Sequence, residues 1–241
     1  ERGEVVDFVG GLTDVEKRLI RTIGDPDVRF QEDPVRILRA IKFAARLGFG
    51  IDPPTYDAMV RHRRELAKAA PPRIAEELAR LLAGGAAEES FRLMEAVGVI
   101  EQILPWVAEA LRGLDPRDFW GRLRALDSIE DASKKFSRVT MLALIYSPIF
   151  ERIAGNATQA NGRDPGVGFT DAMRPLLAGR LLSRREADRM KQIFLSQRRL
   201  LAEPDRGAAR RGRRRRMPPK ALATREYFRE ALAFFKLDCM A

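Results

Sequence analysis

The chain has 241 residues, enough for one large or two small domains, and 45% of them are hydrophobic, so it can bury a core. Its 44 lysines and arginines outnumber its 34 aspartates and glutamates, and the net charge of +10 favours an anionic polymer as partner, nucleic acid before membrane. One cysteine, Cys239, and one histidine, His62, exclude an internal disulfide and leave almost no material for a Ser/His/Asp triad or a histidine-based metal site.

Helical periodicity dominates the first hundred residues. Residues 4–9 are short and precede two glycines, so they form either a strand end or a loop. A helix is predicted over residues 13–20, and either Thr13 or Asp14 can cap its N-terminus. A second helix is predicted over residues 33–47, with Pro34 at its first position and Gly48 as its stop. Three more helices follow in the pattern, over residues 52–59, 71–83 and 91–97.

The second half is predicted to hold short helices up to residue 149, a glycine-rich loop at 156–168, and helices at 171–177 and 183–199. Ser183 followed by Glu186 has the spacing of a capping box. A last helix over residues 225–235 is predicted to dock on the body through its large apolar residues, which are Tyr227, Phe228, Leu232 and Phe235.

The start of the second helix has the most informative chemistry. Asp33, Arg36 and Arg39 are three residues apart, a spacing that places them on one helix face. The carboxylate can accept a hydrogen bond from an amino group and the guanidinium groups can donate paired bonds, so together they can meet the edge of a nucleobase. An ion pair on a solvated helix face is the alternative, and spacing by itself favours that alternative.

The surrounding residues resemble a known family. Arg29-Phe30 followed by Glu32-Asp33-Pro34-Val35-Arg36 and Arg39 resembles the neck motif of bacterial poly(A) polymerases and class II CCA-adding tRNA nucleotidyltransferases. The flanks, at residues 7–14, 52–56 and 72–78, agree with this resemblance, which is specific over residues 5–105. It implies that the motif residues Glu32, Asp33, Arg36 and Arg39 bind the incoming nucleotide. Arg73 and Glu76 are then expected to brace the neck.

The resemblance implies an all-α fold made of multi-helical neck and body domains. It divides the chain into four segments: a remnant of the nucleotidyltransferase head with its linker (1–28), the neck with base recognition and RNA binding (29–90), a helical body (91–205) and an arginine-rich RNA-binding tail with a final helix (206–241).

The family's head carries an Asp-x-Asp motif that holds two Mg²⁺ ions for transfer of AMP from ATP. Residues 25–27 are the chain's only Asp-x-Asp, and they lack the preceding Gly-Ser, so we interpret them as a turn. Because the chain starts at Glu1 rather than methionine, we expect a fragment without catalytic residues or metal ligands that is inactive alone. Mg²⁺ and ATP are expected as cofactors of the intact parent.

Residues 206–216 hold seven arginines and no bulky apolar residue, so we expect this run to be disordered when free. It is predicted to bind RNA phosphates through Arg206, Arg210, Arg211, Arg213, Arg214, Arg215 and Arg216. An unstructured tail that only aids solubility is the alternative. Trp106 and Trp120 could stack on bases, although a place in the core is favoured for both.

The arginine run and the aromatic helix after it resemble the tail of bacterial poly(A) polymerases, which favours polyadenylation of RNA 3′ ends, in mRNA processing and decay, over CCA addition. The alternatives are a CCA-adding enzyme fragment and a helical RNA-binding module without catalysis. No apolar stretch approaches the ~20 residues that span a bilayer, and no signal peptide opens the chain, so we expect a cytoplasmic protein with RNA and ATP as partners. The sequence does not indicate an oligomeric state.

Overall fold

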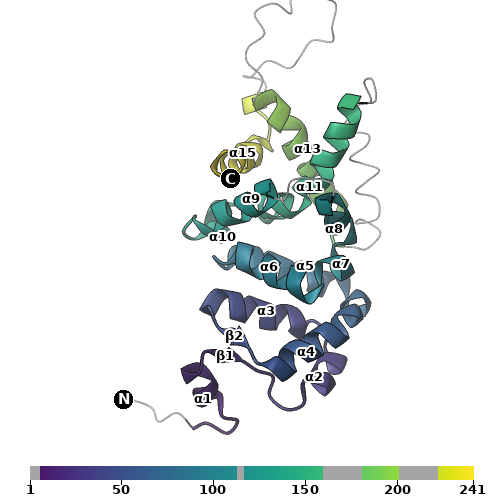
Figure 1. Ribbon diagram of the computed structural model, residues 1–241. Coiled ribbons are helices and arrows are strands. Elements are labelled where there is room, and N and C mark those ends of the chain that lie inside the picture. Colours follow the sequence, from purple (N-terminus) through teal and green to yellow (C-terminus); the bar gives the residue numbers. More distant parts are fainter. Residues whose placement is uncertain (1–5, 113–116, 160–180, 201–221) are drawn as a thin grey trace, which may run out of the picture. The chain divides into compact units, whose positions relative to one another are not determined.

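The computed structural model describes residues 6–112, 117–159, 181–200 and 222–241 (Figure 1). The chain forms two compact units, Glu1–Ala108 and Glu109–Ala241. Helices dominate both units, which confirms the predicted all-α class. The four-segment division expected from the sequence stays a prediction. No helix in the described ranges combines the length and the apolar character needed to cross a membrane.

The first unit is a stack of short helices around one two-stranded parallel sheet. Figure 1 shows α3 between the pair α5 and α6 on one side and the two strands on the other. The elements of this unit are α1 (Gly11–Glu16), β1 (Leu19–Ile20), α2 (Pro26–Glu32), α3 (Arg36–Leu47), β2 (Gly50–Ile51), α4 (Pro53–His62), the 3-10 helix η1 (Arg63–Lys68), α5 (Pro71–Ala83), α6 (Ala87–Val97) and α7 (Ile100–Ile103). Helix α8 (Pro105–Arg112) leads out of it.

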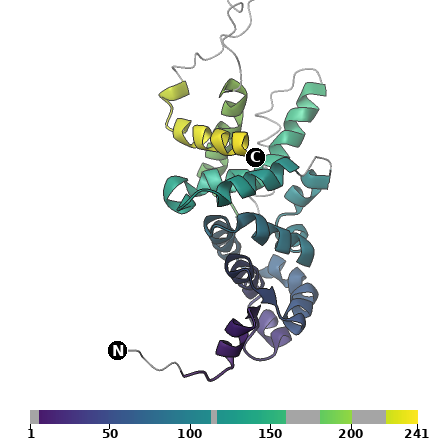
Figure 2. The ribbon, with the colours of Figure 1, turned by 60° about the vertical axis from the view of Figure 1, so that its left-hand side comes forward.

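The N-terminal region differs from its prediction. Helix α1 ends at Glu16, and Leu19–Ile20 is a strand that pairs with Gly50–Ile51 instead of a helical turn. The cause is Arg18, whose positive φ of 55° breaks the helix before the strand. The cap is Asp7 rather than Thr13 or Asp14, because the Asp7 carboxylate accepts hydrogen bonds from amides at the start of α1. Figure 2 shows α1 beside the two strands.

The start of α3 also differs from its prediction. The helix begins at Arg36, and Asp33 lies before it in an extended conformation, with φ −148° and ψ 93°, as the residue that follows the end of α2. A residue before proline is pushed out of the helical region by the proline ring, so Pro34 forces this break at Asp33. Gly48 ends α3 in the left-handed conformation, with φ 62°, which confirms the predicted stop.

The second unit contains α9 (Arg117–Asp127), α10 (Ala132–Lys135), α11 (Arg138–Gln159), α13 (Arg184–Leu200) and α15 (Phe228–Met240). Before α13, the Ser183 hydroxyl accepts from the Glu186 amide at 3.2 Å, while the Glu186 carboxylate accepts from the Ser183 amide at 2.9 Å, which confirms the capping box.

The last helix begins three residues later than predicted, and its buried face is a different one. Ala231, Phe234 and Leu237 are buried, whereas the residues predicted to dock, Tyr227, Phe228, Leu232 and Phe235, are only partly covered. The three buried residues recur at helical spacing on the face that packs against α9, α11 and α13, where the Phe234 ring meets Phe194 of α13 edge-on at 5.4 Å.

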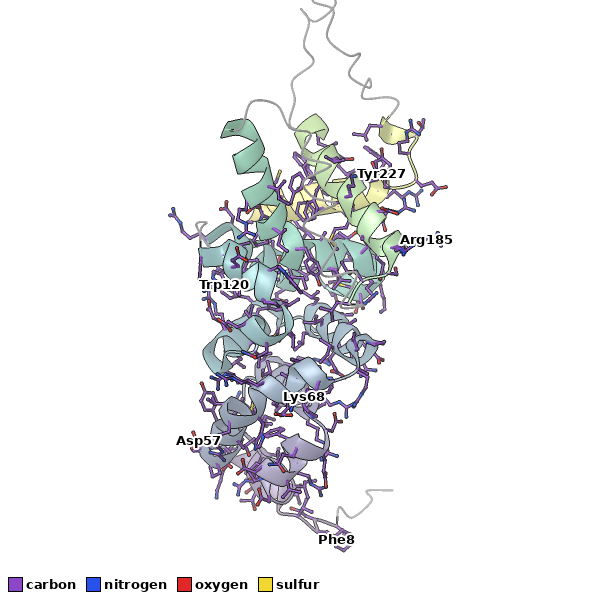
Figure 3. The ribbon with its side chains drawn as sticks, turned by 90° about the vertical axis from the view of Figure 1, so that its right-hand side faces the viewer. Phe8, Asp57, Lys68, Trp120, Arg185 and Tyr227 are labelled. Atoms are coloured by element: carbon purple, nitrogen blue, oxygen red, sulfur yellow. The ribbon has the colours of Figure 1, made fainter. Side chains whose placement is uncertain are left out.

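A buried arginine joins three helices of the second unit. Arg122 of α9 donates to Asp238 of α15 at 2.6 Å and to the Ser147 hydroxyl of α11 at 2.9 Å, and it pairs with Glu151 at 2.5 Å. These partners satisfy a charge that would otherwise be costly to bury. Trp120 of α9, which is labelled in Figure 3, is buried, whereas Trp106 is half-buried.

Candidate nucleotide-binding site

Asp33 lies in the turn between α2 and α3, where Arg73 of α5 holds it. The Arg73 guanidinium donates to the Asp33 carboxylate at 2.8 Å, and the Val35 amide donates to its other oxygen at 3.2 Å. Burial raises the pKa of Asp33, but the hydrogen bond and charge of Arg73, with the Val35 amide and the Arg39 charge, outweigh it and hold the pKa below its ordinary value. A carboxylate has about four acceptor positions, so Asp33 keeps capacity for a ligand.

Arg36 belongs to a group of arginines around a pocket. Glu32 accepts from Arg29 at 3.1 Å and from Arg36 at 3.3 Å, so one carboxylate holds both guanidinium groups. The pocket has a volume of ≈ 380 Å³ and is lined by Arg21, Thr22, Ile23, Arg29 and Arg36. Three arginines beside an isoleucine side chain suit a ligand that has both anionic and flat apolar parts.

Arg39 is held by a buried carboxylate on α5. Glu77 lies 3.5 Å from the Arg39 guanidinium, and it accepts from buried Lys42 at 2.9 Å and from Arg80 at 2.6 Å. Burial raises the pKa of Glu77, but the hydrogen bonds and charges of Lys42 and then of Arg80 outweigh this effect. The pKa of Glu77 therefore lies below its ordinary value. Two ion-pair clusters therefore hold this region against α5, one at Asp33 in the turn before α3 and one at Glu77, which contacts α3 itself.

The three residues predicted to form one face do not bond to one another. The exposed fractions of the side chains are 17% for Asp33, 38% for Arg36 and 45% for Arg39, so all three stay open to a ligand. Asp33 lies in the turn before α3, whereas Arg36 and Arg39 lie in the helix. The three residues are therefore not on one face of a single helix, contrary to the prediction from the sequence. Their role in base recognition stays a prediction.

The bracing residues are only partly those expected. Arg73 contacts Asp33, but Glu76 is 62% exposed and pairs within its own helix with Arg80, because its position points away from α3. Its neighbour Glu77, with a 3% exposed side chain, is the carboxylate that reaches α3. One signal in the sequence could have found it, since Glu77 falls on the apolar face of α5 with Ile74, Leu78 and Leu81.

Residues 25–27 have structural tasks. Asp25 caps α2 by accepting from the Asp27 amide at 2.8 Å, and Pro26 occupies the first position of the helix. The Asp27 carboxylate accepts from Arg61 at 2.8 Å and lies 2.7 Å from His62. The segment is thus a capped helix start rather than a free turn. The arginines at 206–216 lie outside the described residues.

Comparison with known proteins shows what the first unit is similar to. Residues 48–111 match the domain family described as "Probable RNA and SrmB- binding site of polymerase A". The chain is 39% identical over 103 residues to poly(A) polymerase I of Escherichia coli, and 37% identical over 101 residues to a CCA-adding enzyme of Bacillus velezensis. The chain therefore contains a segment that is similar to both poly(A) polymerases and CCA-adding enzymes.

The chain spans only part of the length of the relatives that it matches. The matches include 43% and 42% of the chain but 22% of the E. coli poly(A) polymerase and 26% of the B. velezensis enzyme. The structure resembles that of a Bacillus stearothermophilus CCA-adding enzyme in complex with CTP, with a TM-score of 0.55 and 26% identity over 80% of this chain and 42% of that one. It therefore contains an RNA-binding domain of the family, and both kinds of enzyme are among its relatives.

Proposed function

We propose that this chain is the RNA-binding and nucleotide-selecting part of a poly(A) polymerase that adds AMP from ATP to RNA 3′ ends. The observation that carries the proposal is that Arg36 lines the arginine-lined pocket and Asp33 lies in the turn just before α3, each fixed by a partner of opposite charge. The arginine run at 206–216 supports polyadenylation over CCA addition, because sequence-independent phosphate contacts suit an enzyme that holds many different transcripts.

Selection of adenine over guanine and uracil follows from donors and acceptors. The Asp33 carboxylate accepts from the exocyclic amino group, and the Arg36 guanidinium donates to a ring nitrogen. Glu32 keeps Arg36 in place, and Arg39, held by Glu77, supports the base by orientation and stacking. Since the protein does little covalent chemistry in this transfer, positioning of this kind supplies the neck's share of catalysis.

The family implies Mg²⁺, which would stabilise the attacking and leaving oxygens of the transfer. The described residues do not fit that ion. Asp25 and Asp27 are engaged in a helix cap and in bonds to Arg61 and His62, and no group of three or more potential ligands occurs in the described ranges. We therefore assign no transfer step to this chain.

The test is nucleotide incorporation by the full-length protein on an RNA primer. We expect extension with ATP alone and no extension with CTP alone. CCA addition is the second candidate, favoured by the likeness to a CCA-adding enzyme in complex with CTP. Incorporation of two cytidines before adenosine would replace our proposal with that one, and RNA binding without any incorporation would indicate a non-catalytic module.

The arginine run gives a second prediction. Replacing the seven arginines at 206–216 by glutamine should weaken RNA binding and flatten the dependence of log K on log salt by about 0.7 for each phosphate that the run no longer binds. Lysine at the same seven positions should keep most of the slope, because it keeps the charge. Titrations of a labelled single-stranded RNA between low and moderate salt measure both. A slope that glutamine leaves unchanged would contradict the role of this run.

A further inference from the structure

One face of α3 (Arg36–Leu47) is exposed and combines arginines with large apolar side chains. Phe43 is 47% and Leu47 50% exposed, although most large apolar residues of this unit are buried. At 100° per residue, a single stripe of the helix carries Arg36, Arg39, Phe43, Arg46 and Leu47. We call this stripe the α3 track.

The opposite face of α3 explains why the track has a fixed orientation. Ile37, Leu38 and Ile41 are fully buried against the neighbouring helices, so α3 cannot rotate to hide Phe43. The exposure of Phe43 is thus set by the packing of the helix, not by a loose local structure.

The charges of the track are available to a ligand. Arg46 is exposed and has no acidic partner among the residues that the structure describes. Its stem lies over Gly84, where an added Cβ would meet the Arg46 Cδ at 3.0 Å, so the absence of a side chain there gives Arg46 its place. The Arg39 guanidinium lies 3.5 Å from the Glu77 carboxylate, which bonds Lys42 and Arg80 at shorter distances, so Arg39 is its weakest partner. A second cation, Lys42, lies 5.0 Å from the Phe43 ring centroid.

The track begins at the candidate nucleotide site, because Arg36 both lines the pocket and opens the stripe. From Arg36 to Leu47 the helix rises about 16 Å at 1.5 Å per residue, the length of roughly five stacked nucleotides at 3.4 Å each. A strand whose end reaches the pocket can therefore lie along the whole track.

We propose that the α3 track binds the single-stranded 3′ end of RNA, with one base stacked on Phe43 and phosphates on Arg39 and Arg46. This inference rests on the proposed function, since the RNA end must approach the nucleotide at Arg36. Aromatic side chains stack on any base and arginines contact any phosphate, so the track suits transcripts of different sequence. A protein partner fits less well, because the centres of protein interfaces are depleted of charge, whereas arginines flank Phe43 one turn away on both sides.

The decisive experiment is photocrosslinking of this chain to single-stranded RNAs that carry 5-iodouridine at one of the last five positions. We expect a crosslink to Phe43 from at least one position, identified by mass spectrometry of the joined peptide. Phe43→Leu should remove that crosslink and weaken RNA binding by about tenfold, since it keeps an apolar side chain but loses the stacking surface. Phe43→Trp should restore both.

The phosphate contact is tested in parallel. Arg46→Gln should lower the salt slope of RNA binding by about 0.7, the value for one phosphate on a single strand. Arg92→Gln is the matched control, because the Arg92 guanidinium already pairs with Glu88 at 2.7 Å on a different helix, and its slope should equal that of the unmodified chain.

The outcomes separate this inference from the proposed function. Full RNA affinity in Phe43→Leu, with crosslinks that map elsewhere, would overturn the track and leave base selection at Asp33 and Arg36 untouched. An intact Phe43 crosslink in a full-length protein that incorporates no ATP would instead keep the track and reject the polymerase. Circular dichroism and thermal melting confirm that each variant is folded.

Discussion

Replacing Glu77 by alanine is expected to lower the free energy of unfolding of the first unit by about 3 kcal/mol, near the lower end for breaking a buried ion pair. The Glu77 carboxylate is buried and accepts from Lys42 and Arg80, and it lies near Arg39. Its removal leaves the buried Lys42 ammonium without a counter-charge, while both arginines can turn to solvent. Chemical denaturation followed by circular dichroism measures the change.

Glu76→Ala is the matched control, because Glu76 is the preceding residue of the same helix. Its carboxylate is exposed and pairs only with Arg80, so the loss should stay below about 0.5 kcal/mol. Equal losses for the two variants would show that the helix, and not the buried contact, sets the effect.

The same carboxylate makes stability depend on pH. The pKa of Glu77 lies below its ordinary value of 4.5 in the folded chain, so its stabilising contribution is full above that value and is lost as the pH falls through the lower folded pKa. Glu77→Gln should therefore flatten the loss of stability on acidification below pH 4.5. A variant whose acid dependence equals that of the parent would place the sensitive group elsewhere.

Replacing Asp33 by alanine should reduce the preference of the full-length protein for ATP over GTP and UTP by about 10- to 100-fold, the range expected when one interaction with a base edge is removed. Arg36→Ala should have a similar effect, since the two side chains meet different atoms of one base. Competition binding and single-nucleotide incorporation measure the preference. RNA affinity should stay nearly unchanged, because neither residue is assigned a phosphate contact.

Two further variants separate recognition from local structure. Asp33→Asn keeps an acceptor for the Val35 amide but turns one oxygen into a donor, so it should lose selectivity with little loss of stability. Asp27→Asn alters a nearby carboxylate whose partners are Arg61 and His62, and its nucleotide preference should equal that of the parent. If Asp33→Asn retains full preference for ATP, the assignment of the base-reading face is wrong.

Local signals in the sequence predicted the local features of this fold. The Ser183–Glu186 capping box and the Gly48 stop depend on residues within one helical turn, and both were visible in the pattern. The all-α class followed from the helical periodicity and the family motif. The break at Asp33 was missed although Pro34 signals it, because a proline also fits the first turn of a helix.

Contacts between distant residues were beyond the sequence pattern. Glu77 meets Lys42 across 35 positions, and nothing in the spacing of either residue specifies the other. The docking face of α15 depends on Phe194, 40 residues before Phe234, and so its register could not be derived from the helix alone. The candidate site residues themselves came from the motif, whereas the partners that hold them came from tertiary packing.

The ion pair between Arg73 and Asp33 affects the protonation state of the Asp33 carboxylate, and therefore the hydrogen bonds that this carboxylate can accept from a base. With its pKa held below the ordinary value of 3.8, this carboxylate is ionised near neutral pH. The Asp33 oxygens therefore remain acceptors for the exocyclic amino group of a base. For the base-reading role that we propose, this means that the protonation of Asp33 would not vary between mildly acidic and alkaline conditions.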